Sequence, residues 1–222
     1  MRLETYTSRA ALMQGLAKVM AGELRLALRF GPATLSVPGG TTPGPVFDAL
    51  AQMDLDWGHV AVVLNDERWV GADSPRSNTR LLRERLLVGK AAMAQLVPLY
   101  VPLPQPEDGL AQLAAGILPH LPISVLLLGM GLDMHTASLF PGADLLAQAL
   151  SDDAPPVMAL RAEAAGEPRI TLTAPVLKAA QHIHVLITGA EKRAALERAL
   201  QLPVSDAPIM AVLDQATVHW AE

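Results

Sequence analysis

The feature that most constrains the fold of this chain is a succession of short apolar runs separated by helical patterns. The runs are rich in aliphatic and β-branched residues and comprise Ala33–Val37, His59–Leu64, Leu96–Leu99, Ile123–Leu128, Arg169–Thr173, His182–Thr188 and Thr217–Trp220. Several are continuously apolar rather than alternating, which is typical of strands that helices cover on both faces. The repeated strand–helix–strand order therefore predicts an α/β fold with a doubly wound, mostly parallel sheet and helices on both faces.

The helical patterns between these runs carry start signals. Between Ser8 and Phe30 apolar residues recur every three or four positions, which predicts a long amphipathic helix with Ser8 as its N-cap. Further helices are expected at Pro45–Met53, Ser77–Leu87, Glu107–Leu118, Ala174–Ala180 and Ala190–Leu200. The proline-rich segment Pro98–Pro106 fits an extended connection, because apolar strands resume on both sides of it. We expect one Rossmann-like domain over residues 1–222.

Composition limits the classes of partner and chemistry. A chain of 222 residues, 51% of them hydrophobic, has enough apolar material for the core of one α/β domain. Its net charge of −5 and the lack of a basic run argue against a nucleic-acid partner. The absence of cysteine excludes disulfides, thiolate metal sites and cysteine nucleophiles.

The N-terminus has no apolar signal core, and the longest strongly apolar stretch, Ile123–Leu128, is far shorter than the roughly 20 residues that cross a bilayer. We therefore expect a cytoplasmic protein with no membrane partner. The sequence leaves open whether it is a monomer or a small homo-oligomer.

Open α/β sheets bind ligands beyond the carboxyl ends of their strands, and a glycine–threonine segment follows the first apolar run at such an end. Gly39 and Gly40 let the backbone approach a ligand closely, while Thr41 and Thr42 place hydroxyls at the mouth of the next helix. A helix N-terminus offers free N–H groups and a positive dipole end, which suit a phosphate. The alternative is a tight turn with a threonine cap, since the segment is neither a Walker loop nor a dinucleotide fingerprint.

A charged segment, Asn65-Asp66-Glu67-Arg68-Trp69, follows the second apolar run. Arg68 at this edge could make charge-assisted hydrogen bonds to a phosphate or to a developing oxyanion. A solvated turn is the alternative interpretation of the same residues.

The segment with the strongest chemical signal begins at Gly129 and Gly131, where a buried run ends, and continues to Asp133 and His135. Asp133 could orient or polarise His135, and a neutral imidazole is the usual group that takes a proton from water near pH 7. A histidine is more often structural, but its place after two glycines at a strand end favours a general base.

Two further cations lie where an anion-binding edge would need them. Arg169 begins a predicted strand, and Lys192 lies where a strand enters a helix. Read alone, each is a surface charge. In a chain of net negative charge, however, an anionic substrate requires cations gathered locally.

Taken together, these segments resemble the 6-phosphogluconolactonase family, within a wider group that includes glucosamine-6-phosphate deaminase. The resemblance follows chain order and is carried by Gly39-Gly40-Thr41-Thr42-Pro43, Asn65-Asp66-Glu67-Arg68-Trp69, Ser77-Asn78, Gly129-Met130-Gly131, Asp133, His135, Ala137-Ser138-Leu139-Phe140-Pro141-Gly142, Pro168-Arg169-Ile170-Thr171, Gly189 and Lys192. Each piece alone is weak, but the ordered set is specific.

The resemblance implies hydrolysis of 6-phospho-D-glucono-1,5-lactone to 6-phosphogluconate, in the oxidative pentose phosphate pathway. His135 would be the general base and Asp133 its support. The glycine–threonine loop, Arg169 and Lys192 would hold the phosphate, and Arg68 would contact anionic or polar groups of the substrate. The family needs no metal or cofactor and forms no covalent intermediate, so the expected partner is a small phosphorylated sugar lactone.

One residue departs from the family pattern. The family usually has glycine between the aspartate and the histidine, and this chain has Met134. If that position requires a positive φ angle, a non-glycine residue there costs on the order of 1–3 kcal/mol. Either the loop differs slightly or the methionine side chain narrows the pocket.

Three other functions are weighed against the lactonase. The deaminases carry a glutamate just before the loop proline, whereas this chain has Phe140, which has no proton to exchange. A non-catalytic sugar-phosphate sensor would normally bring a DNA-binding helical domain, for which no sequence is left over. A metal site at His182 and His184, on one face of a predicted strand, lacks an apparent third ligand.

Overall fold

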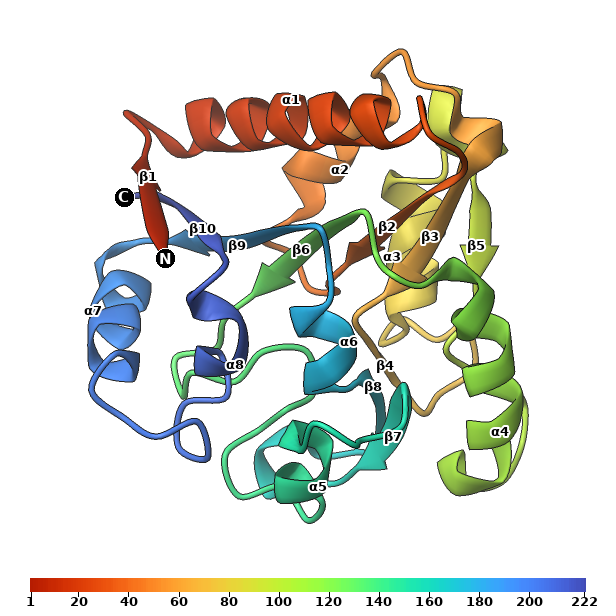
Figure 1. The fold of residues 1–222 in the computed structure, drawn as a ribbon, viewed down its shortest axis with the longest axis vertical. Coiled ribbons are helices and arrows are strands. Elements are labelled where there is room, and N and C mark those ends of the chain that lie inside the picture. The colour runs from red at the N-terminus through yellow and green to blue at the C-terminus, as the bar shows by residue number, and fades with distance from the viewer.

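A computed structural model describes all residues, 1–222, and its main feature is a seven-stranded parallel sheet with the order β1-β10-β9-β6-β2-β3-β5 (Figure 1). Its strands are β1 (Arg2–Thr5), β2 (Ala33–Val37), β3 (Val60–Leu64), β5 (Gln95–Val97), β6 (Val125–Gly129), β9 (His182–Thr188) and β10 (Thr217–Ala221). All six neighbouring pairs are parallel. The predicted α/β fold is confirmed.

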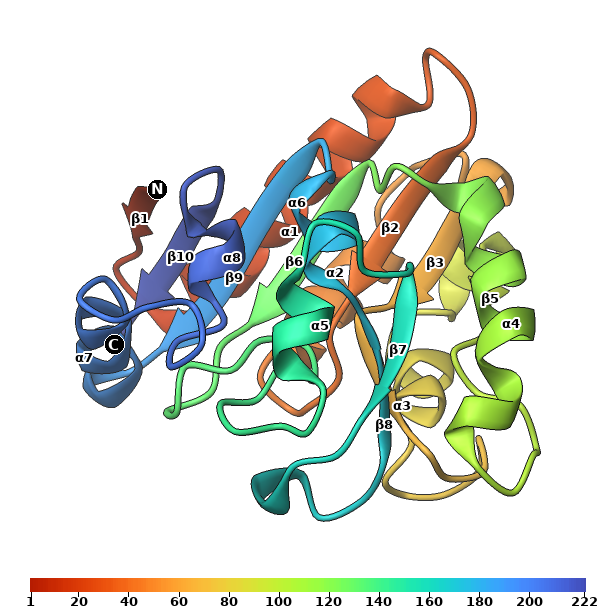
Figure 2. The same ribbon diagram turned by 60° about the horizontal axis from the view of Figure 1, so that its bottom comes forward.

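Helices cover both faces of this sheet. They are α1 (Arg9–Ala27), α2 (Gly44–Ala51), α3 (Asn78–Arg85), α4 (Pro106–Ile117), α5 (Leu146–Leu150), α6 (Ala174–Lys178), α7 (Ala190–Ala199) and α8 (Met210–Leu213). Figures 1 and 2 place α1 on one face and α6 and α8 on the other. Ser8 caps α1, as predicted, because its side chain accepts a hydrogen bond from the Ala11 N–H. No helix combines the length and apolarity needed to cross a lipid bilayer.

The core forms where the apolar stripe of α1 meets the sheet. Leu12, Leu16, Met20 and Leu24 follow the helical period and are completely buried, while every residue of β2 and β3 is buried. A strand buried on both faces needs no polar alternation, which explains why β3 is continuously apolar, whereas β2 also buries the hydroxyls of Thr34 and Ser36.

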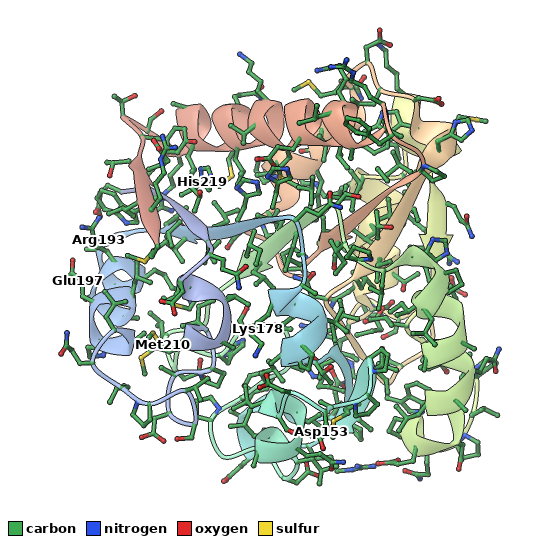
Figure 3. The ribbon with its side chains drawn as sticks, viewed as in Figure 1. Asp153, Lys178, Arg193, Glu197, Met210 and His219 are labelled. Carbon is green, nitrogen blue, oxygen red and sulfur yellow. The ribbon has the colours of Figure 1, made fainter.

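A chain of polar side chains crosses the face of the sheet beneath α1. The Tyr6 hydroxyl lies 2.9 Å from His219 Nδ1, and His219 Nε2 lies 3.0 Å from His184 Nδ1. His184 Nε2 and His182 Nδ1 contact the Glu23 carboxylate at 2.7 and 3.3 Å. Figure 3 shows His219 on β10, close to α1. Burial lowers the pKa of His219 to about 3, and His184 acts in the same direction.

The order of the strands creates a crevice between β2 and β6. From β2 the chain builds outward through β3 and β5, then returns to place β6 on the other side of β2 and continues through β9 and β10. The loops that leave β2 and β6 therefore diverge at the carboxyl ends of these neighbouring strands. Such a topological switch point is where open α/β sheets bind ligands.

A second, antiparallel sheet lies beside the crevice, with the order β4-β8-β7. Its strands are β4 (Asp66–Arg68), β7 (Val157–Leu160) and β8 (Arg169–Leu172). The apolar run at Arg169–Thr173 was correctly predicted as a strand, but its assumed place in the main sheet is wrong. Periodicity reports that a segment is extended and buried, whereas the partner strand depends on contacts distant in sequence. The short strands β1, β4 and β7 were not predicted.

Candidate active site

A cleft of about 390 Å³ opens at this crevice. It brings together most of the residues predicted for the site, namely Gly39, Gly40, Thr42, Arg68, His135, Arg169 and Lys192. They come from the loops after β2 and β6, from both strands β4 and β8, and from the start of α7. Thr41 lies outside the cleft and lines a neighbouring hollow, which meets the cleft at Thr42 and Thr188.

Asp133 and His135 form a direct pair, with His135 Nδ1 at 2.6 Å from Asp133 Oδ1. A carboxylate only accepts hydrogen bonds, so Nδ1 carries the proton and Nε2 is left as the acceptor. The bond to His135 holds the pKa of Asp133 below its ordinary value, against the opposing effect of burial. His135 lines the cleft and Asp133 does not, which is the geometry of a base with an orienting carboxylate behind it.

The turn that holds this pair depends on Gly131. A β-carbon at Gly131 would lie 2.1 Å from Asp133 Oδ1 and 2.2 Å from His135 Nδ1. The Gly131 N–H donates to the His135 carbonyl at 2.9 Å, and the Met134 N–H donates to the Gly131 carbonyl at 3.1 Å. The two side chains therefore fold so closely over Gly131 that a β-carbon there would displace them.

Met134 has a φ of 65°, so the position where the family usually has glycine does require the left-handed conformation. Holding a non-glycine residue there costs about 1–2 kcal/mol. The side chain of Met134 packs against the hydrophobic core and does not line the cleft. The loop thus keeps its turn at the expense of local strain, and the methionine does not narrow the pocket.

Phe140 lies between His135 and Arg169. Its ring centroid is 4.1 Å from that of His135, with the planes inclined by 30°, and 5.9 Å from the guanidinium carbon of Arg169. Phe140 is buried and lines the cleft. The sequence did not predict that Phe140 stacks on His135, because this contact depends on the conformation of the loop that joins the two residues.

The alternation of β4 separates the two acids that precede Arg68. Successive residues of a strand point to opposite faces, so Asp66 and Arg68 line the cleft while Glu67 points away from it. Glu67 is completely buried, and its carboxylate accepts four hydrogen bonds of 2.7 to 3.0 Å. Three come from the backbone N–H groups of Arg68, Asn78 and Thr79, and the fourth comes from the Ser77 hydroxyl. These donors include the free N–H groups at the start of α3. Glu67 is therefore a structural carboxylate that fixes α3 to β4.

The register of the small sheet pairs Arg68 with Arg169. The Nε atoms of both are buried without a hydrogen-bond partner. Burial lowers the pKa of Arg169, and the neighbouring Arg68 also lowers it, whereas Asp66 raises it. Two adjacent guanidinium groups that line the cleft are suited to an anionic ligand.

Lys192 approaches the cleft from the first turn of α7. Its Nζ donates to the Met130 carbonyl at 2.6 Å, and burial lowers its pKa while Asp133 raises it. Across the cleft, a β-carbon at Gly39 would lie 1.9 Å from Asn78 Oδ1, so this loop can pack on α3 only as glycine. Gly40 has a φ of 84°. No group of three or more His, Asp or Glu side chains lies together in a way that could hold a metal ion.

Comparison with known proteins yields full-length matches. Residues 7–220 match the family described as Glucosamine-6-phosphate isomerases/6-phosphogluconolactonase. The chain is 42% identical over 224 residues to a 6-phosphogluconolactonase of Mesorhizobium japonicum, which covers 97% of this chain and 93% of that protein. It is 38% identical over 228 residues to one of Rhizobium meliloti, with 99% and 98% covered. The crystal structure of a 6-phosphogluconolactonase from Shewanella baltica has a TM-score of 0.96 at 35% identity, covering 100% of this chain and 97% of that one.

Proposed function

This chain belongs to the 6-phosphogluconolactonase family and hydrolyses the phosphorylated lactone of the pentose phosphate pathway, and we propose that His135 is the general base of that reaction. One observation carries the proposal: a histidine whose Nδ1 proton is held by Asp133 lines a cleft that also contains three cations. An imidazole in this tautomer has Nε2 free to accept a proton.

The reaction follows from that arrangement. Nε2 of His135 takes a proton from water as the water oxygen attacks the lactone carbonyl, forming a tetrahedral intermediate. Asp133 stabilises the resulting imidazolium. The intermediate then collapses with cleavage of the bond between the carbonyl carbon and the ring oxygen. The imidazolium returns its proton to that oxygen, which becomes a hydroxyl, and the new carboxylic acid ionises.

The cations hold the substrate in place. Lys192, Arg169 and the glycine–threonine loop grip the phosphate, and Arg68 contacts anionic or polar groups of the sugar. Each charge-assisted hydrogen bond contributes roughly 1.5–3 kcal/mol. Fixing the phosphate also fixes the carbonyl relative to the water near His135, which converts binding energy into orientation.

Substitution of His135 tests the proposal. A general base contributes about 10²–10⁴-fold, so His135→Ala should lower kcat by that factor with little change in KM. Lys192→Ala and Arg169→Ala should mainly raise KM, by about 10- to 150-fold. The assay is lactone hydrolysis corrected for the spontaneous reaction.

His59 provides a matched control. Its Nδ1 contacts Asp56 Oδ2 at 2.8 Å, so it has the same carboxylate contact as His135, but it is exposed and remote from the cleft. His59→Ala should leave kcat unchanged. A His135→Ala enzyme with undiminished kcat would remove the general-base assignment. Glucosamine 6-phosphate should release no ammonia, because Phe140 cannot exchange a proton.

A further inference from the structure

One carboxylate lies among the cations of the cleft. Asp66 lines the cleft beside Arg68 and Arg169, and only 10% of its side chain is exposed. A negative charge repels a phosphate a few ångströms away, and weak solvation strengthens that repulsion. For the binding of a phosphate alone, this negative charge is unfavourable.

The contacts of Asp66 leave one of its oxygens unused. Oδ2 accepts a hydrogen bond from Ser138 Oγ at 2.5 Å and lies 3.8 Å from Arg169 Nη1. Oδ1 accepts no hydrogen bond from the protein. The Nε atoms of Arg68 and Arg169 are buried without a partner, whereas Oδ1 is accessible to solvent. An ionised carboxylate accepts at both oxygens, so Oδ1 offers the cleft an acceptor without a donor.

We propose that Asp66 is a specificity-determining residue whose Oδ1 accepts a hydrogen bond from a hydroxyl group of the sugar. The inference rests on the function proposed above and names the part of the substrate that this end of the cleft recognises. An acceptor beside two guanidinium donors matches a polyhydroxy phosphate, whose hydroxyls donate and whose oxygens accept. The same charge disfavours a bare phosphate, so Asp66 contributes both attraction for the right ligand and repulsion of a wrong one.

The variant Asp66→Asn separates these two effects. Arg169 Nη1 only donates, so it favours the amide oxygen at the place of Oδ2, and the amide nitrogen then takes the place of Oδ1. The substitution therefore removes a negative charge and turns the free acceptor into a donor. Losing the charge strengthens the binding of any anion. Losing the acceptor weakens the binding only of a ligand whose hydroxyl group donates a hydrogen bond to it.

The two probes are inorganic phosphate, as a competitive inhibitor, and 6-phosphogluconate, titrated by calorimetry. In Asp66→Asn the inhibition constant of phosphate should fall a few-fold. The Kd of 6-phosphogluconate should rise by about 10- to 150-fold, the range for a hydrogen bond to a charged group. Opposite changes for two anions at one site are not expected from a general loss of structure.

Glu167→Gln is the matched control. Glu167 pairs with Arg76 and lies close enough to influence Arg169, but it does not line the cleft. Removing this charge should strengthen the binding of phosphate and of 6-phosphogluconate by a similar factor. The two affinities should therefore change in the same direction, unlike those of Asp66→Asn.

Deoxygenated ligands test the contact on the unmodified enzyme. Among 2-, 3- and 4-deoxy-6-phosphogluconate, one should bind about 10- to 150-fold more weakly than the parent, and Asp66→Asn should add no further loss for that ligand. If Asp66→Asn binds both anions more strongly, the carboxylate acts only by repelling anions, and the proposal is overturned. Equal weakening of both anions, or no loss with any deoxy ligand, would overturn it as well. The titrations of 6-phosphogluconate and of its deoxy analogues involve no catalysis, so an active His135→Ala enzyme would refute the general base and leave their result standing.

Discussion

Adding one methyl group at Gly131 should disable the Asp133–His135 pair without removing either side chain. The β-carbon of an alanine would lie 2.1 Å from Asp133 Oδ1 and 2.2 Å from His135 Nδ1. Ordinary contact begins near 3.4 Å, so the two side chains must each move by about 1.2 Å or more. The φ angle of Gly131 is not positive, so the backbone itself accepts alanine.

The size of the effect follows from the sensitivity of catalysis to position. A displacement of about 1 Å costs roughly 10²-fold in rate, so Gly131→Ala should lower kcat by about 100-fold, equivalent to about 2.7 kcal/mol of activation free energy. The free energy of unfolding should change by less than about 1 kcal/mol, because glycine-to-alanine replacement also restricts the unfolded chain. Steady-state hydrolysis and urea unfolding of the same preparation measure the two quantities.

A double substitution shows whether Gly131 acts through His135. In the His135→Ala background the proposed base is already absent, so Gly131→Ala should cause no further loss of kcat. Gly22→Ala is the control for the methyl group itself, because its β-carbon would meet nothing within 4 Å. An unchanged kcat in Gly131→Ala, or a full 100-fold loss that persists without His135, would refute this reasoning.

Two further predictions concern stability. Folded His219 has a pKa of about 3 against about 6.5 in the unfolded chain, so below pH 6.5 only the unfolded chain takes up this proton. The free energy of unfolding should therefore fall by about 2 kcal/mol between pH 7.5 and pH 5, and His219→Gln should lack that contribution in urea unfolding. Glu67→Gln leaves the donors at one carboxylate oxygen, such as Thr79 N, without an acceptor and should lower the free energy of unfolding by about 2–4 kcal/mol. Because Glu67 lies outside the cleft, the folded fraction of this variant should keep a nearly normal kcat, and a large loss of kcat would contradict its structural role.

Local features of the sequence determined the main secondary structure and the contact between Asp133 and His135. Ser8 and Ser77 cap the helices that follow them because capping depends on a side chain and the next few backbone N–H groups. Asp133 and His135 are two positions apart, and so their contact requires only a tight turn. The positive φ considered for Met134 is likewise a property of that turn, and the structure has it.

Long-range pairing decided the rest. Arg68 and Arg169 are far apart in the sequence, and only the register of the small antiparallel sheet makes them neighbours. In β4, Asp66 points into the cleft and Glu67 points toward α3. The sequence alone does not distinguish the roles of these two adjacent acids. A side chain on the face of a strand that other elements cover becomes a structural acceptor, whereas one on the open face can reach a ligand. Only the tertiary packing determines which face of the strand is covered.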